Sequence, residues 1–139
     1  MAVTSPYGTI LEKPRMNAGL ETHTPQAINA TATATAGQVA SGYITSTSAA
    51  ATTITLPTGT LLGAELGAVQ GTVHHLYIDN TAGANTVTIA VATNGILSAL
   101  AAADALGAGL LTVPAGVTGQ ACFKIMFSSP TAYTFTRVA

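Results

Sequence analysis

The residues best suited to metal chemistry are two adjacent histidines, His74 and His75. They lie in a run that alternates as a strand does, so their side chains point to opposite faces and cannot both bind one metal ion within one subunit. Copies of one histidine could complete a metal site on a three-fold axis of an oligomer. Nothing in the sequence favours that site over stacked, hydrogen-bonded rings, and we predict that both histidines are structural.

The acidic residues show no catalytic grouping. The sequence pairs none of them with another carboxylate or with a histidine at catalytic spacing. They are Glu12, Glu21, Glu65, Asp79 and Asp104. The serines lack the context of a nucleophile elbow, and the segment 107–109 lacks the third glycine of a dinucleotide site. The sequence therefore predicts no catalytic, cofactor-binding or metal-binding residues, and a protein that is not an enzyme.

Charge is scarce along the whole chain. Only 6% of the 139 residues are charged, compared with about 25% in an ordinary soluble domain. No lysine or arginine occurs between Arg15 and Lys124, so we expect no basic patch that could bind nucleic acid or anionic lipid. So neutral a surface offers little repulsion against association, and we expect it to pack against neighbouring subunits.

The apolar window from Ile96 to Val113 is about long enough to cross a bilayer, but Asp104 and two glycines interrupt it. We therefore expect no membrane span. Cys122 is the sole cysteine and cannot form a disulfide within the chain, and the N-terminus lacks the pattern of a secretory signal. Both features indicate folding in a reducing cytoplasm.

The stretch 72–92 is the clearest structural signal. From Thr86 to Val91, threonine alternates with valine and isoleucine, the two-residue period of a half-buried strand. The polar segment 80–85 before it contains turn-forming residues, and an apolar run ends at position 78. We interpret the stretch as a hairpin with a loop of about four to six residues.

Other segments repeat this alternation at a spacing of about ten residues, which is typical of a β-sandwich, jelly roll or barrel. Additional strands are predicted over residues 27–36, 39–47, 52–56, 96–103, 110–113, 120–127 and 131–138, with one helical stretch over 61–69. Glycines 63, 67 and 71 are interpreted as turn positions. The segments 27–35 and 131–138 would leave uncharged sheet edges. One core is predicted from Ile54, Leu56, Val87, Ile89, Phe123, Ile125 and Phe127.

Residues 1–25 differ from the rest. They hold three of the six prolines and four of the nine charged side chains, with no sustained period. We predict an extended N-terminal arm over 1–25 and a single β-domain over 26–139. The arm is either a loose tail or a strap that orders on a partner. Its candidate contact residues are Ile10, Leu11, Lys13, Arg15, Met16 and Leu20.

Five segments together resemble the all-β capsid decoration, or cement, proteins of tailed bacteriophages. They are Thr53–Pro57 (TITLP), His75–Asn80 (HLYIDN), Ala84–Ile89 (ANTVTI), Phe123–Phe127 (FKIMF) and Ala132–Val138 (AYTFTRV). The resemblance covers roughly residues 50 to 139. It implies a small jelly-roll or β-sandwich domain of about eight strands, made in the host cytoplasm and seated as a homotrimer on the capsid surface of the virion. Its partner would be the major capsid protein, which the arm would help to bind.

The same pattern is similar to β modules of tail fibres, which leaves a second function open. Such a module would recognise host glycans, and glycan sites need exposed aromatic rings for stacking. This chain has no tryptophan and only 5% aromatic residues, most of them at inward strand positions. The composition therefore favours the decoration protein.

Overall fold

The computed structural model describes residues 21–97 and 111–139, which form two mixed β-sheets and two short helices. The six-stranded sheet contains, in spatial order, β1 (Gln26–Ala27), β3 (Tyr43–Thr45), β5 (Val73–Asp79), β9 (Gln120–Ser129), β10 (Ala132–Arg137) and β7 (Gly95–Leu97). The four-stranded sheet contains β2 (Ala32–Thr33), β4 (Thr52–Thr55), β6 (Val87–Ala90) and β8 (Thr112–Val113). The helices are α2 (Ala36–Ala40) and α3 (Gly59–Leu66). The fold is mostly β, as predicted.

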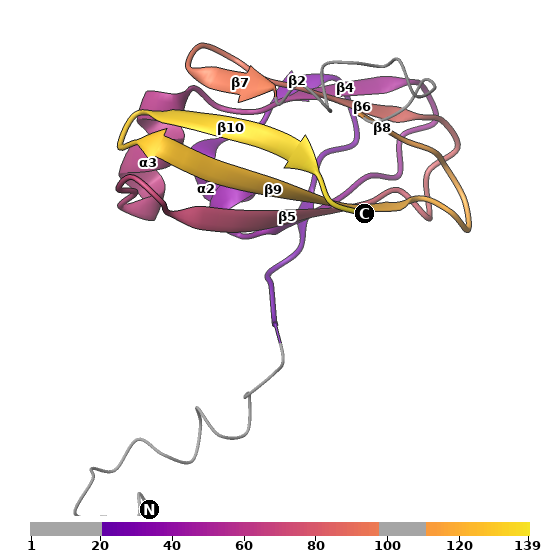
Figure 1. The fold of residues 1–139 in the computed structure, drawn as a ribbon. Helices are drawn as coiled ribbons and strands as arrows, with labels where there is room; N and C mark the ends of the chain where they lie inside the picture. Colours follow the sequence, from indigo (N-terminus) through magenta and orange to yellow (C-terminus); the bar gives the residue numbers. More distant parts are fainter. Residues whose placement is uncertain (1–20, 98–110) are drawn as a thin grey trace, which may run out of the picture.

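From β1 to β8 the described strands alternate between the two sheets (Figure 1). Up to β6, each strand that returns to a sheet lies beside the previous strand of that sheet and runs in the same direction, whereas β8 pairs antiparallel with β6. The neighbours β1, β3 and β5 are accordingly parallel, and so are β2, β4 and β6. Within the described residues, β9 and β10 are the consecutive strands that pair as a hairpin.

The predicted hairpin over 72–92 is wrong in its pairing. Both strands exist, but β5 belongs to the six-stranded sheet and β6 to the four-stranded sheet. The segment between them crosses from one sheet to the other, and buried Asn80 anchors it by donating from Nδ2 to the carbonyl oxygens of Asn85 and Val113. Alternation identifies the buried face of a strand but does not identify the strand that pairs with it. A connection of six to seven residues is also long enough to cross the distance of about 10 Å between packed sheets.

The predicted strand over 27–36 is divided in two. β1 lies at the edge of the six-stranded sheet and β2 at the edge of the four-stranded sheet, so the edge position was correct. The chain then enters α2, which the sequence analysis missed and which delays the next strand to Tyr43. A capping box begins this helix: the Thr35 side chain accepts from Gln38 N, and the Gln38 side chain accepts from Thr35 N.

The predicted helix over 61–69 is confirmed as α3. Thr58 caps its start, and Gly67 ends it in the left-handed conformation (φ 59°). The interpretation of Gly63 as a turn residue is wrong, because it lies inside the helix and faces the turn between β9 and β10. A β-carbon there would overlap the carbonyl oxygen of Pro130, so glycine permits this close contact.

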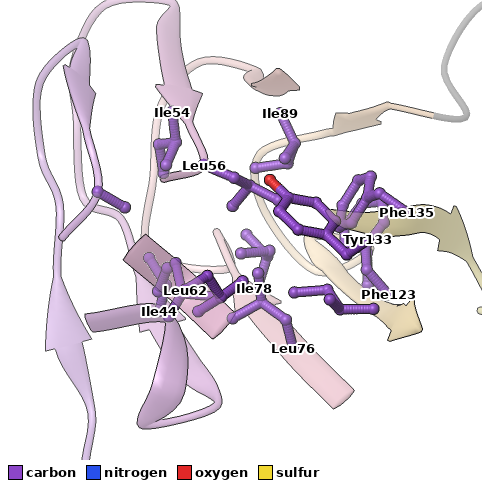
Figure 2. Packing of buried hydrophobic residues seen from close by; sticks show 14 of the residues in the cluster. Ile44, Ile54, Leu56, Leu62, Leu76, Ile78, Ile89, Phe123, Tyr133 and Phe135 are labelled. Carbon is purple, nitrogen blue, oxygen red and sulfur yellow. The ribbon is translucent and has the colours of Figure 1, made fainter. Parts of the chain in front are cut away.

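All seven predicted core residues are buried in one hydrophobic cluster that both sheets and both helices share. Figure 2 shows side chains of the two sheets meeting around Tyr133 and Phe135 of β10. The Tyr133 hydroxyl donates to the Pro57 carbonyl oxygen at 2.9 Å, and the rings of Phe123 and Phe135 stack at 4.8 Å between centroids. The core is thus built by alternate residues of the strands, as expected.

The last strand is not a sheet edge, contrary to prediction. β10 pairs with β9 on one side and with β7 on the other. Residues 95–97 supply β7, which confirms a strand at the start of the predicted segment 96–103; residues 98–103 lie outside the described residues. No helix within residues 21–97 and 111–139 is long and apolar enough to cross a membrane.

Candidate functional site

The outer face of the six-stranded sheet presents the side chains that alternate with the core residues. Tyr43 of β3 and Tyr77 of β5 are register partners on neighbouring parallel strands, so their side chains leave the sheet next to each other. Cys122 of β9 is the partner of Tyr77 on its other side. Asp79 and Gln120 form the next pair along the same two strands.

Three hydrogen bonds fix the Asp79 carboxylate. The Tyr43 hydroxyl donates to Oδ2 at 2.6 Å, while the hydroxyl and the backbone N–H of Thr81 donate to Oδ1 at 2.6 and 3.0 Å. The Thr81 hydroxyl and then the Tyr43 hydroxyl hold the pKa of Asp79 below its ordinary value. The bond to Asp79 in turn raises the pKa of Tyr43, because losing the phenol proton would place two negative charges together.

Residues 21 to 23 attach to this face beside Tyr77. The Tyr77 hydroxyl donates to Oε2 of Glu21 at 2.7 Å, and Nε2 of His23 lies 3.6 Å from the same oxygen. On the other side of the imidazole, Nδ1 lies 2.8 Å from the Ser41 carbonyl oxygen. A carbonyl can only accept, so Nδ1 carries the proton of this bond. The His23 ring also packs against the Tyr77 ring, with 5.5 Å between centroids.

These contacts set the protonation states of the site. The hydrogen bond to Glu21 is the main reason that the pKa of Tyr77 rises to about 12, and the same bond lowers the pKa of Glu21. Partial burial raises the pKa of the Cys122 thiol. At neutral pH the two carboxylates are therefore ionised, while both phenols and the thiol keep their protons.

The face is hollowed on both sides of the two tyrosines, and we call this feature the tyrosine hollow. One lobe has a volume of about 260 Å³ and is lined by Tyr43, Tyr77, Ile78, Asp79, Gln120, Ala121, Cys122 and Ala139. The other has a volume of about 400 Å³ and is lined by Glu21, Thr22, His23, Pro25 and the same two tyrosines. Aromatic rings thus separate two small cavities, each of which contains one carboxylate.

Comparison of this chain with protein-family models, curated proteins and solved structures finds no match. What the hollow can do follows from its own atoms. A phenol or thiol that keeps its proton is a weak nucleophile. Ionised carboxylates beside aromatic rings instead favour the binding of a cation.

A second feature of the same face is a row of four residues on four strands, three of which are exposed apolar side chains. Val73 of β5 pairs with Met126 of β9, Met126 with Thr134 of β10, and Thr134 with Ile96 of β7. Val73, Met126 and Ile96 are 45%, 41% and 56% exposed, respectively. We call these four residues the apolar row. Large apolar side chains gathered on one exposed face are typical of a surface that contacts another protein.

The candidate contact residues of the arm, which are Ile10, Leu11, Lys13, Arg15, Met16 and Leu20, lie outside the described residues. His74 and His75 do lie on opposite faces of β5, as predicted. His74 has a structural contact, because its Nε2 lies 2.8 Å from the Val39 carbonyl oxygen. Within residues 21–97 and 111–139, no three histidine, cysteine or acidic side chains are grouped closely enough to hold a metal ion.

The tyrosine hollow was not predicted from the sequence. Glu21 and Asp79 were expected to be isolated carboxylates, whereas each accepts a hydrogen bond from a tyrosine of the sheet. One signal was present: Tyr77 lies between buried Leu76 and Ile78, so alternation places its ring on the outer face. The contact between residue 21 and residue 77 is long-range and had no signal in the sequence.

Proposed function

We propose that this chain is a structural virion protein that decorates a bacteriophage capsid and stabilises it by bridging neighbouring subunits of the major capsid protein. The observation that carries the proposal is the composition of the outer face of the six-stranded sheet. It combines the apolar row with the tyrosine hollow, and it holds one lysine, Lys124, between them. Tyrosine and methionine are enriched where proteins contact each other, and lysine is depleted there.

The fold agrees with this role. We propose that the two sheets form a β-sandwich rather than a jelly roll, because a jelly roll is antiparallel and five of the eight strand pairings in the described residues are parallel. A rigid two-layer domain presents one broad sheet face to a partner. Many copies of a modest interface stabilise a shell through their number.

The protonation states of the site favour a structural role over catalysis. Tyr43, Tyr77 and Cys122 keep their protons at neutral pH, so none of them is prepared to act as a nucleophile or a general base. The bonds of Glu21 and Asp79 to these tyrosines fix the geometry of the face.

A homotrimer is part of the proposal. The four-stranded sheet ends in β2, and residues 30–33 around it are exposed and uncharged. Natural sheets commonly protect such an edge with charge or proline, which supports pairing of this edge with another copy of the chain. Light scattering after gel filtration at micromolar concentration should give the mass of a trimer. A stable monomer would contradict this part of the proposal.

The tail-fibre alternative keeps one observation in its favour, which is that Tyr43 and Tyr77 face outward beside carboxylates. A glycan can stack on a tyrosine ring and donate hydroxyl protons to a carboxylate. Binding to capsid shells distinguishes the two functions, because a glycan-binding module has no reason to occupy an empty shell.

The test is sedimentation with empty shells assembled from the major capsid protein of the same genome. Full-length protein should pellet with the shells at a fixed ratio to capsid subunits. A truncation lacking residues 1–20 should fold but bind less, since it keeps the Glu21 and His23 contacts and loses the apolar residues of the arm. A matched full-length variant carries Ile10→Ser and Leu11→Ser, and it separates the loss of apolar side chains from the loss of the arm itself. Failure of the full-length protein to pellet would contradict the proposed function.

A further inference from the structure

The tyrosine hollow uses most of its hydrogen-bond donors internally. The phenol protons of Tyr43 and Tyr77 go to Asp79 and Glu21, and the Nδ1 proton of His23 goes to the Ser41 carbonyl oxygen. Both hydrogens that Thr81 can donate go to Asp79. Gln120 and Thr22 also line the hollow and can still donate, whereas the two tyrosines between its lobes have no free proton to donate.

Acceptors remain in excess. Each phenol oxygen keeps lone pairs after donating its proton, and a carboxylate offers about four acceptor positions, of which Asp79 uses three. With Glu21 and Asp79 ionised, the hollow carries negative charge beside unused acceptors.

No lysine or arginine is among the residues that line either lobe of the hollow. Lys124 pairs with His75 and Thr136, one cross-strand row away from the tyrosines. Arg137 lies near the Phe123 ring and donates to the carbonyl oxygens of Thr112 and Ala139. A ligand that matches the hollow must therefore bring both positive charge and several donors.

Shape narrows the choice of cation. A guanidinium group is planar, offers five N–H donors in a fixed fork, and stacks on aromatic rings, whereas an ammonium group is a compact and strongly hydrated charge. The residues that line the smaller lobe include Tyr43, Tyr77 and Asp79. Rings and carboxylate together suit a flat cation on an aliphatic stem.

We propose that the tyrosine hollow binds the side chain of an arginine presented by a partner protein, with the guanidinium group stacked on a tyrosine and hydrogen-bonded to Asp79 or Glu21. This inference rests on the proposed function, because it assumes that the chain binds another protein. It adds the chemistry of the contact. The arginine would be an anchor at the polar end of a face whose other end is the apolar row.

The first test uses N-acetyl-arginine amide as the probe and the intact chain in solution, with backbone amide signals followed by NMR. Saturable shifts at Tyr43, Tyr77 and Asp79 in the millimolar range are expected, since a single side chain binds weakly. N-acetyl-citrulline amide has nearly the same shape without the charge, and it should produce at least about fivefold weaker binding. A methyl glycoside is the third probe, and it tests whether the hollow binds a glycan instead.

Two substitutions test the assigned groups. Asp79→Asn and Glu21→Gln each remove a charge with little change in shape, and each should weaken binding of the arginine probe at least about threefold. Glu65→Gln is the matched control, because it removes an exposed carboxylate on α3 that lines neither lobe of the hollow. Retained dispersion of the amide signals verifies that each variant is folded.

The outcomes separate this inference from the proposed function. Equal binding of arginine and citrulline probes, or tighter binding of the glycoside at these residues, would overturn the inference. If the intact chain sediments with shells and the double variant E21Q/D79N does so equally well, the inference is also overturned while the function stands. If the arginine probe binds as expected but no shell is bound, the arginine site stands, and the partner that presents the arginine is not the capsid protein.

Discussion

Gly63→Ala tests the packing of α3 against the six-stranded sheet. Gly63 faces the turn between β9 and β10, and a β-carbon at this position would lie closer than 3.0 Å to the Pro130 carbonyl oxygen. It would also lie 3.3 Å from Cε1 of Phe127. The first obstacle is backbone, so it cannot move away by rotation of a side chain, and α3 or the turn has to shift.

Two terms set the magnitude. Alanine is more favourable than glycine inside a helix by about 0.5 to 1 kcal/mol. Overpacking of a close contact costs about 1 to 3 kcal/mol, and the upper part of that range applies when the obstacle is a carbonyl group. We therefore expect Gly63→Ala to reduce the free energy of unfolding by about 2 kcal/mol.

Denaturant unfolding followed by circular dichroism measures this change. Gly37→Ala in α2 is the matched control, because a β-carbon there meets nothing closer than 3.9 Å, at Oε1 of Glu65. The control should be neutral or more stable by up to about 1 kcal/mol. If Gly63→Ala is as stable as the control, α3 does not press on the Pro130 turn, and the packing described above is wrong.

Three further predictions concern the core, the segment that crosses between β5 and β6, and the stability of the fold at alkaline pH. Phe127→Ala should cost about 3 to 5 kcal/mol in denaturant unfolding because the ring is buried, whereas exposed Met126→Ala should cost under about 1 kcal/mol; similar losses would refute the strand register. Asn80→Asp should lower thermal stability more than Asn80→Ala, because it places a carboxylate against three backbone carbonyl oxygens; the reverse order would refute the anchoring role. The pKa values of Tyr77 and Tyr133 are both raised to about 12, so the unfolded chain releases these protons at lower pH than the folded chain does. The free energy of unfolding should therefore hold below about pH 10 and fall between about pH 10 and 12. Denaturant unfolding measured across this range with no loss of stability would contradict the prediction.

The local periods in the sequence were enough to predict which residues are buried. Ile54, Val87 and Phe123 alternate with polar residues, and burying one face of a strand forces that pattern. The same reasoning located β9 and β10, whose pairing is a local hairpin. Periodicity therefore predicted seven residues of the core and the strands that carry them.

Periodicity could not predict strand neighbours. The segment 80–86 was consistent with a hairpin turn and with a crossing between sheets, because both require a short polar connection. The buried side chain of Asn80 distinguishes them, since its three bonds to carbonyl oxygens fix the crossing, and two of those partners, Val113 and Pro114, come from distant positions. That crossing places β6 beside β4, and the two strands pair in parallel.

The candidate site was harder to predict than the fold. Tyr43 and Tyr77 meet because β3 and β5 are neighbours, which the sequence analysis did not establish. Glu21 was assigned to the arm, and its bond to Tyr77 joins positions 56 residues apart. The missed helix α2 had a local signal, the Thr35 to Gln38 capping box, so that omission could have been avoided.

The most direct test of the capsid function is the melting temperature of empty shells, measured by scanning calorimetry with and without saturating protein. A protein that bridges capsid subunits binds the assembled shell better than separated subunits, so the shell transition should move to higher temperature as occupancy rises. The truncation lacking residues 1–20 should produce a smaller shift at equal total concentration. An unchanged shell transition at demonstrated full occupancy would contradict the proposal that this chain stabilises a capsid.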